Sequence, residues 1–187
     1  MVRHHLAGMV ASVLRGMVAL VGCLGLMAST AASEPQVTRL AAVRTDGPIA
    51  LGPGPTRLTL TGPDAPGTAI QALGPGRDLY LVFAGLRAAE QPGVVYYVYL
   101  APPATGAPPG PDSPFFVGTL NFFAAGNLGY GGPAGAHPTV SLNVTAVGRE
   151  LAAKGLLGRQ TSLTIVPDGV PAPEAKPSIE SVALVAQ

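Results

Sequence analysis

The prolines restrict most strongly what this chain of 187 residues can fold into. All twenty lie after residue 34, and they cluster between short apolar runs instead of inside them. Proline has no amide hydrogen to donate to a sheet ladder, so it is confined to turns, strand ends and edge strands. The apolar runs are four to nine residues long and rich in Val, Leu, Tyr, Phe and Thr. This pattern predicts an all-β domain of short strands.

About eight strands are predicted, at residues 37–44, 56–61, 78–86, 94–101, 115–123, 139–143, 161–166 and 179–185. The short connection 87–93 predicts that the strands on either side of it are antiparallel neighbours. Gly118 lies inside a predicted strand and indicates a β-bulge or a close approach of two chain segments. We therefore expect an antiparallel β-sandwich, jelly-roll-like in organisation.

One short α-helix interrupts the strands and begins at Thr145. Val147 and Leu151 fall on one face at helical spacing. Asn143 or Thr145 can cap the first turn, and Gly155 supplies the left-handed residue that commonly ends a helix. The predicted fold class is therefore all-β with a single short helix.

The N-terminal segment has the composition of a secretory signal peptide of the bacterial type. Basic residues precede an apolar run over residues 16–27, and small residues at Thr30 and Ala32 suit cleavage after Ala32. We expect a signal peptide at 1–32 and a single domain at 33–187. The domain would then be exported, to the periplasm or outside the cell, with no membrane span after cleavage.

Two alternatives stay open for this segment. The run between Arg15 and Glu34 is 18 residues, just long enough for a retained membrane anchor. Leu20-Val21-Gly22-Cys23 also resembles the bacterial lipobox, in which the cysteine is lipidated and becomes the mature N-terminus. In that case the protein would be a lipoprotein anchored through Cys23.

Charge and metal-ligand content exclude several classes of function. Cleavage after Ala32 removes two of the eleven basic residues, which leaves nine basic and ten acidic residues. Nucleic acid requires a clustered basic surface, and this charge balance argues against one. The cleavage also removes the single cysteine and leaves His137 as the only histidine. Tetrahedral zinc and type-3 copper sites need more such ligands. We expect no metal, no cofactor and no nucleic-acid partner.

Catalytic patterns are missing as well. No Gly-x-Ser-x-Gly sequence is present, and His137 precedes Pro138 in a Gly/Ala-rich loop where a solvated role is expected. The carboxylates are spread singly, mostly in turns, although two that meet in space would leave an enzyme open. We therefore expect a protein that is not an enzyme and has no catalytic residues.

Aromatic residues are concentrated in the middle of the chain. Strands use most of them in the core. Phe122, Phe123 and Tyr130 are the candidates for contact with a partner or ligand, because they lie at or beyond the end of a predicted strand.

Six segments carry, in this order, a resemblance to a known family: 79–86, 95–100, 113–123, 140–145, 162–167 and 179–184. Val95-Tyr96-Tyr97-Val98-Tyr99-Leu100 followed by Phe116-Val117-Gly118-Thr119-Leu120 is similar to the paired strands of the C-terminal β-domain of tyrosinases and polyphenol oxidases. The catalytic part of that family is a helical domain with six copper-binding histidines, and nothing in this chain matches it. The resemblance therefore covers the C-terminal β-domain alone, here free-standing.

In that family the C-terminal domain packs over the dicopper pocket and shields it. The resemblance implies a non-catalytic exported module that shields or assists a separately encoded, tyrosinase-like type-3 copper oxidase. A cell-envelope structural or glycan-binding module is the alternative function. Coplanar exposed aromatic side chains beside paired polar groups would favour a glycan-binding module.

Overall fold

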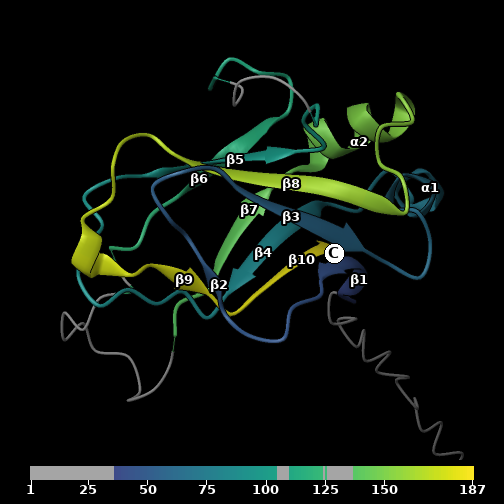
Figure 1. Cartoon of the computed structure of the whole chain (residues 1–187). Coiled ribbons are helices and arrows are strands. Elements are labelled where there is room, and N and C mark those ends of the chain that lie inside the picture. The colour runs from purple at the N-terminus through teal and green to yellow at the C-terminus, as the bar shows by residue number, and fades with distance from the viewer. Residues whose placement is uncertain (1–35, 105–109, 124, 126–136) are drawn as a thin grey trace, which may run out of the picture. The chain divides into compact units, whose positions relative to one another are not determined.

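The computed structural model describes residues 36–104, 110–123, 125 and 137–187 (Figure 1). The expected signal peptide at 1–32, the lipidation expected at Cys23 and the candidate contact residue Tyr130 all lie outside these residues. Among the residues that are described, no helix combines the length and the apolar character needed to cross a bilayer.

The domain is built on one antiparallel sheet. Its strands are β1 (Thr38–Val43), β3 (Thr56–Thr61), β4 (Leu79–Ala84), β5 (Tyr96–Leu100), β6 (Phe116–Leu120), β7 (Val140–Asn143), β8 (Gln160–Pro167) and β10 (Ser181–Ala186). These eight strands are hydrogen-bonded in the order β6-β5-β8-β3-β1-β10-β4-β7. A second sheet pairs β2 (Ile49–Ala50) with β9 (Ser178–Ile179). The predicted all-β antiparallel fold class is confirmed.

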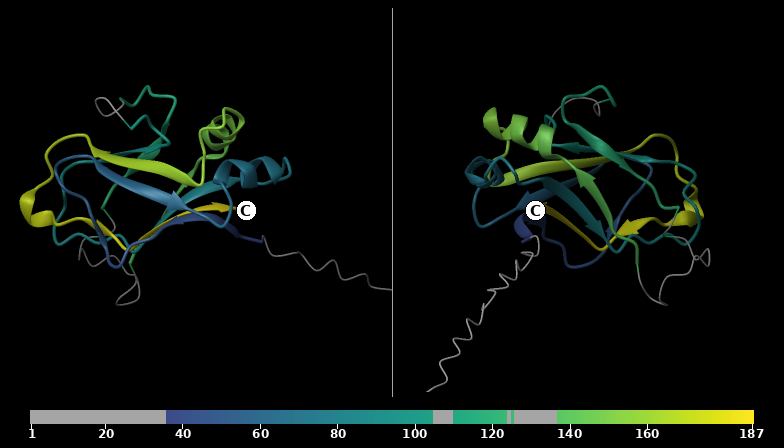
Figure 2. Two further views of the ribbon diagram at one scale, coloured as in Figure 1. Left: turned by 45° about the vertical axis from the view of Figure 1, so that its right-hand side comes forward. Right: turned by 180° about the vertical axis from the view of Figure 1, so that it is seen from behind.

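The large sheet folds over on itself into two layers (Figure 2). The register between β1 and β3 has only two residue pairs, Ala42 with Thr61 and Val43 with Leu60, and the sheet turns from one layer to the other there. On the opposite side the two edge strands touch. A Cβ added to Gly118 of β6 would lie 3.2 Å from Cδ1 of Leu142 in β7. The sheet is therefore nearly closed around its interior.

Leucine and aromatic side chains fill that interior. Along β4, Leu79, Leu81 and Phe83 are fully buried and alternate with partly exposed neighbours, because successive side chains in a strand point to opposite faces. Each such side chain stabilises the fold by about 1.5–3 kcal/mol when buried. The only cysteine, Cys23, is outside the described residues, so no disulfide joins them. The stability of the domain therefore depends on this burial of apolar side chains.

The bulge indicated by Gly118 is confirmed. In the β5–β6 ladder, Val98 lies opposite Gly118 but Tyr99 lies opposite Phe116, so Val117 is an extra residue. Gly118 has φ +146°, a conformation that side chains rarely adopt. The bulge therefore depends on a residue without a Cβ.

Three predictions about the strands are wrong. β4 and β5 are not neighbours: β4 pairs with β10 and β7, whereas β5 pairs with β6 and β8. The connection between them crosses from one layer to the other, because β4 and β5 lie in different layers and both face the shared interior. The strand expected at 179–185 is divided into β9 and β10, which belong to different sheets. The two-residue strand β2 was not predicted, because it is too short to show an alternating pattern.

The prediction of a single helix is also wrong, because the described residues contain two α-helices. α1 (Pro66–Ala72) begins with Pro66 and Gly67, residues that usually mark turns but are tolerated in the first turn of a helix. α2 (Thr145–Ala153) is the helix expected from the sequence. The two pack together: the Gln71 side-chain amide of α1 donates to the Ala152 carbonyl of α2 at 2.8 Å. The Gly67 amide donates to the Leu157 carbonyl, in the segment after α2, at 2.9 Å. A short 3-10 turn, η1 (Pro173–Ala175), precedes β9.

The glycine expected at the end of α2 is present, whereas the residue at the N-cap is Val144 and makes no side-chain cap hydrogen bond. The Asn143 side-chain oxygen accepts a hydrogen bond from the Thr145 amide at 3.0 Å. The Thr145 hydroxyl accepts one from the Leu79 amide at 2.9 Å and so ties the helix to β4. Gly155 has φ +70° and ends the helix.

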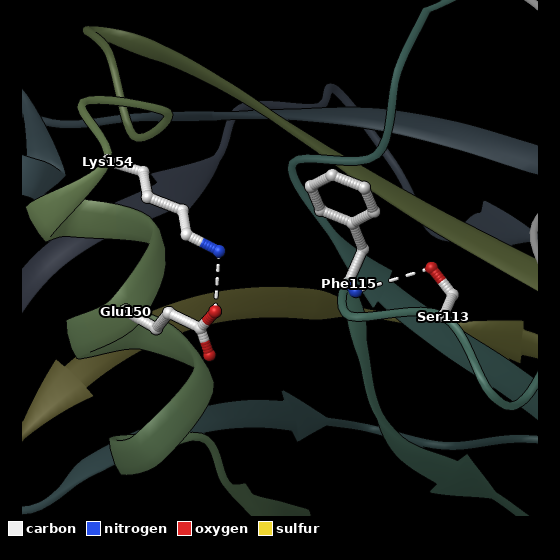
Figure 3. Close-up of polar contacts among 4 residues, drawn as sticks. All are labelled: Ser113, Phe115, Glu150 and Lys154. Atoms are coloured by element: carbon white, nitrogen blue, oxygen red, sulfur yellow. Dashed lines mark hydrogen bonds and ion pairs between the residues drawn. The ribbon is translucent and has the colours of Figure 1, made fainter.

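Local polar contacts add little to this packing. Figure 3 shows Lys154 paired with Glu150 at 2.6 Å and the Ser113 hydroxyl accepting from the Phe115 amide at 3.3 Å. Both side chains of the ion pair are 55% exposed. An exposed i,i+4 pair of this kind stabilises a helix by only about 0.3–0.5 kcal/mol.

Two tyrosines are buried without a polar partner. Tyr96 and Tyr99 are fully buried, and their hydroxyl groups make no hydrogen bond in the described part of the chain. Burial raises the pKa of both phenols, and the neighbouring Tyr97 raises that of Tyr99 further. The packing of the two rings thus comes with a desolvation cost at the hydroxyl.

Gly118→Ala should destabilise the domain by about 1–3 kcal/mol, because an L residue is strained at this φ and its Cβ would meet Leu142. Urea unfolding measures the change. Gly158→Ala is the matched control, since no atom lies within 4 Å of its added Cβ. An unchanged midpoint for Gly118→Ala would contradict the role of the bulge.

Replacing Tyr96 and Tyr99 by Phe should leave stability at pH 7 unchanged or raise it by up to about 1 kcal/mol, because hydroxyls without partners are removed. Above about pH 10 these tyrosines ionise in the unfolded chain while burial keeps them protonated in the folded chain. The unmodified protein therefore loses stability as the pH rises above 10, and the double variant loses less. Urea unfolding at pH 7 and pH 11 compares them, and equal losses would argue against this assignment.

Candidate functional site

Loops gather at one end of the two-layered sheet, and the helices lie at the other. Figure 1 shows α1 and α2 on the right and η1, with the turn around it, on the left. We call the segments 85–95, 121–123 with Ala125, and 168–177 the loop end. Backbone hydrogen bonds join them: the Ala172 amide donates to the Pro92 carbonyl at 2.9 Å, and the Asp168 amide donates to the Val95 carbonyl at 3.0 Å.

The loop end contains two of the three predicted contact residues, in opposite environments. Phe122 is 1% exposed and packs edge-on against Tyr96, with ring centroids 5.5 Å apart. Phe122 is therefore a core residue without surface for a partner, which corrects the expectation. Phe123 is 71% exposed. Both residues follow the end of β6, where the chain turns, and only the Phe122 ring packs into the core.

The backbone that carries Phe123 is held in place. The Gln91 side-chain amide donates to the carbonyls of Phe122 and Phe123, at 3.2 and 3.4 Å. The Phe123 amide donates to the Asn121 side-chain oxygen at 3.4 Å, a local turn that ends the strand earlier than predicted. The ring thus projects into solvent from a fixed backbone. Aromatic residues presented in this way serve as anchors in protein interfaces.

A hollow of about 240 Å³ adjoins the Phe123 ring. Its lining includes the apolar Val94 and Val95 and the polar Gln91, Asn121 and Asp168. The Asp168 carboxylate accepts from the Val95 amide at 3.1 Å and so joins β5 to the segment after β8. An apolar centre with a polar rim is the usual composition of a contact surface between proteins.

The chemical groups considered for catalysis do not converge in the described residues. His137 is exposed at the start of the segment leading to β7. No group of three or more His, Cys, Asp or Glu side chains in the described ranges is arranged to hold a metal ion.

Gln91 and Asp168 were not predicted as site residues. Gln91 precedes Phe123 by 32 residues and Asp168 follows it by 45, and neither sits in a motif. The pairing of β5 with both β6 and β8 brings them together. The proximity of Gln91 and Asp168 to Phe123 follows only from the order of the strands in the sheet, which was not predicted from the sequence.

Comparisons with known proteins bear on the fold. No family model matches the chain, and no curated protein matches it by sequence. Several solved structures are similar to it, including the following two. A recombinantly expressed latent aurone synthase, a polyphenol oxidase, has a TM-score of 0.51 and 12% identity over 76% of this chain and 26% of that chain. The latent apple tyrosinase has a TM-score of 0.50 and 16% identity over 74% of this chain and 27% of that chain.

These similarities concern a domain-sized part of larger proteins. The chain spans about a quarter of the length of the two structures that it matches. At this identity the likeness establishes the fold. The resemblance noted in the sequence is confirmed at this level, since the described residues adopt a fold found in plant polyphenol oxidases and tyrosinases, consistent with the C-terminal domain of that family.

Proposed function

We propose that this protein is a non-catalytic accessory module that binds a separately encoded, tyrosinase-like type-3 copper oxidase and shields its active site. The observation that carries the proposal is the fold shared with about a quarter of two enzymes that are both described as latent. A domain that accompanies a latent enzyme is suited to an accessory role, and here it would act from a separate chain.

The loop end is the proposed contact surface, with Phe123 as its anchor. The ring is 71% exposed while Gln91 fixes the backbone beneath it, so little order is lost when a partner covers it. Burying a phenylalanine side chain in a partner's pocket contributes about 1.5–3 kcal/mol. The polar groups of Asn121 and Asp168 beside it would form the rim of the interface.

The proposal also includes export of the module from the cytoplasm. A signal peptide at 1–32 would direct the module to the periplasm or the exterior, and lipidation at Cys23 would instead keep it at a membrane surface. In either case the partner oxidase must be exported too. The copper in this complex would belong to the oxidase.

A glycan-binding role is less well supported. Such a site stacks sugar rings on coplanar exposed aromatic side chains, and among the described residues only Phe123 is an exposed aromatic. We therefore retain the protein partner as the proposed function.

Phe123→Ser should weaken the complex by about 10- to 150-fold, because 1.5–3 kcal/mol of buried apolar surface is lost. The partner is a tyrosinase catalytic domain from the same organism, prepared without any C-terminal domain of its own. Co-elution and the rate of diphenol oxidation are measured with and without the module. The unmodified module should co-elute and lower the rate.

The matched control is Leu156→Ser, which changes another exposed apolar side chain, 45% exposed, beyond the end of α2. This variant should bind like the unmodified module. If Phe123→Ser binds equally well, the surface is wrong. If the unmodified module neither forms a complex nor alters the oxidation rate, the function is wrong.

Gln91→Met should weaken the complex by less than Phe123→Ser does. The variant keeps the length of the side chain but removes the donor that holds the Phe122 and Phe123 carbonyls. The ring stays available but its backbone becomes freer, so binding must order it again. Hydrogen exchange at the Phe123 and Ala125 amides should become faster. Unchanged exchange together with unchanged affinity would contradict the positioning role of Gln91.

A further inference from the structure

A second hollow at the loop end shares no lining residue with the one beside Phe123. It measures about 230 Å³ and lies between residues 51–53 and the turn 170–177. Leu51 forms a buried part of its wall, and Val170, 80% exposed, stands at its surface. An apolar side chain this exposed next to a concave apolar wall marks a place where a ligand would remove carbon surface from water.

The walls of this hollow are poor in hydrogen-bond donors. Four of its nine lining residues are prolines, which have no amide hydrogen. The Leu51 amide already donates to the Pro177 carbonyl, and the Ala172 amide to the Pro92 carbonyl, both at 2.9 Å. Lys176 is the one charged residue in the lining. The hollow therefore combines carbon surface with a single cation.

Lys176 occupies a backbone conformation that favours glycine. It follows η1 with φ +43° and ψ +50°, in the left-handed region. Four other positive-φ positions in the described residues, Gly85, Gly93, Gly118 and Gly155, are glycines, and Ala101 is the only further exception. In a chain with 25 glycines, a lysine at such a position indicates that its side chain is needed.

The ammonium group of Lys176 is not occupied by a carboxylate. Within the part of the chain that is described, the ion pairs are Arg87 with Glu180 and Lys154 with Glu150. Glu174, two residues before Lys176 in η1, makes no ion pair with it. A cation beside an apolar wall, with no internal counter-ion, complements an anion that has an apolar body.

We propose that this hollow binds a small apolar carboxylate, with the carboxylate paired to Lys176 and the apolar body against Leu51, Val170 and the prolines. The site is independent of the proposed partner oxidase. It uses different residues from the Phe123 surface, and its test needs no second protein.

The test titrates 3-phenylpropanoate into the purified protein and follows the amide resonances of Val170 and Lys176 by NMR. Saturable shifts are expected, and the uncharged 3-phenylpropanamide should bind at least tenfold more weakly. Lys176→Gly should lose binding by at least tenfold while its urea midpoint stays the same or rises, because the left-handed position is relaxed. Retained folding distinguishes a lost ligand contact from a lost structure.

Two further variants complete the design. Lys176→Arg keeps the positive charge and should retain binding. Lys154→Ala removes a lysine beyond the end of α2 and should bind like the unmodified protein. The proposal is overturned if the unmodified protein shows no saturable shift, if the amide binds as tightly as the carboxylate, or if Lys176→Gly binds equally well.

Discussion

Burial of apolar side chains between two layers of one folded-over sheet is the constraint on which the rest of the structure depends. Leu81 of β4 and Leu163 of β8 lie in different layers, and both are fully buried only because the sheet turns over between β1 and β3. Closure on the other side requires Gly118, where the edge strand β6 comes close to Leu142 of β7. No disulfide within the described residues supplements this packing. The stability of the core therefore depends on the curvature of the sheet.

The same curvature brings together the segments of the loop end. Because β5 pairs with both β6 and β8, the segments before β5, after β6 and after β8 emerge side by side. Gln91, Phe123 and Asp168 meet there although many residues separate them along the chain. The proline-rich turn that follows Asp168 forms the second hollow with residues 51–53. The two proposed recognition surfaces thus both lie on loops that the sheet positions, as is common for binding loops.

The predictable parts of the fold were those encoded in local patterns. The strand at 56–61 was predicted with its observed bounds, and the helix beginning at Thr145 was predicted from its apolar spacing and its flanking Asn143 and Gly155. α1 was not predicted from the sequence, because Pro66 and Gly67 usually mark a turn. Their helical conformation depends on packing against the segment that follows α2. The prediction that β4 pairs with β5 was wrong because a short connection can either form a hairpin or cross between layers. Burial in the closed sheet decides between the two, and the connection itself does not.

For the candidate site, the sequence by itself predicted only that Phe122, Phe123 and Tyr130 lie at or beyond the end of a strand, as candidates for contact with a partner. It also determined the fold class and the resemblance to the tyrosinase C-terminal domain, because both follow from the order and composition of short segments. Only the tertiary structure decided that Phe122 is the buried ring and Phe123 the exposed one, and that Gln91 and Lys176 matter. The reason is physical: which face is buried, which segments meet and which backbone is forced into a left-handed turn depend on contacts between residues far apart in the chain.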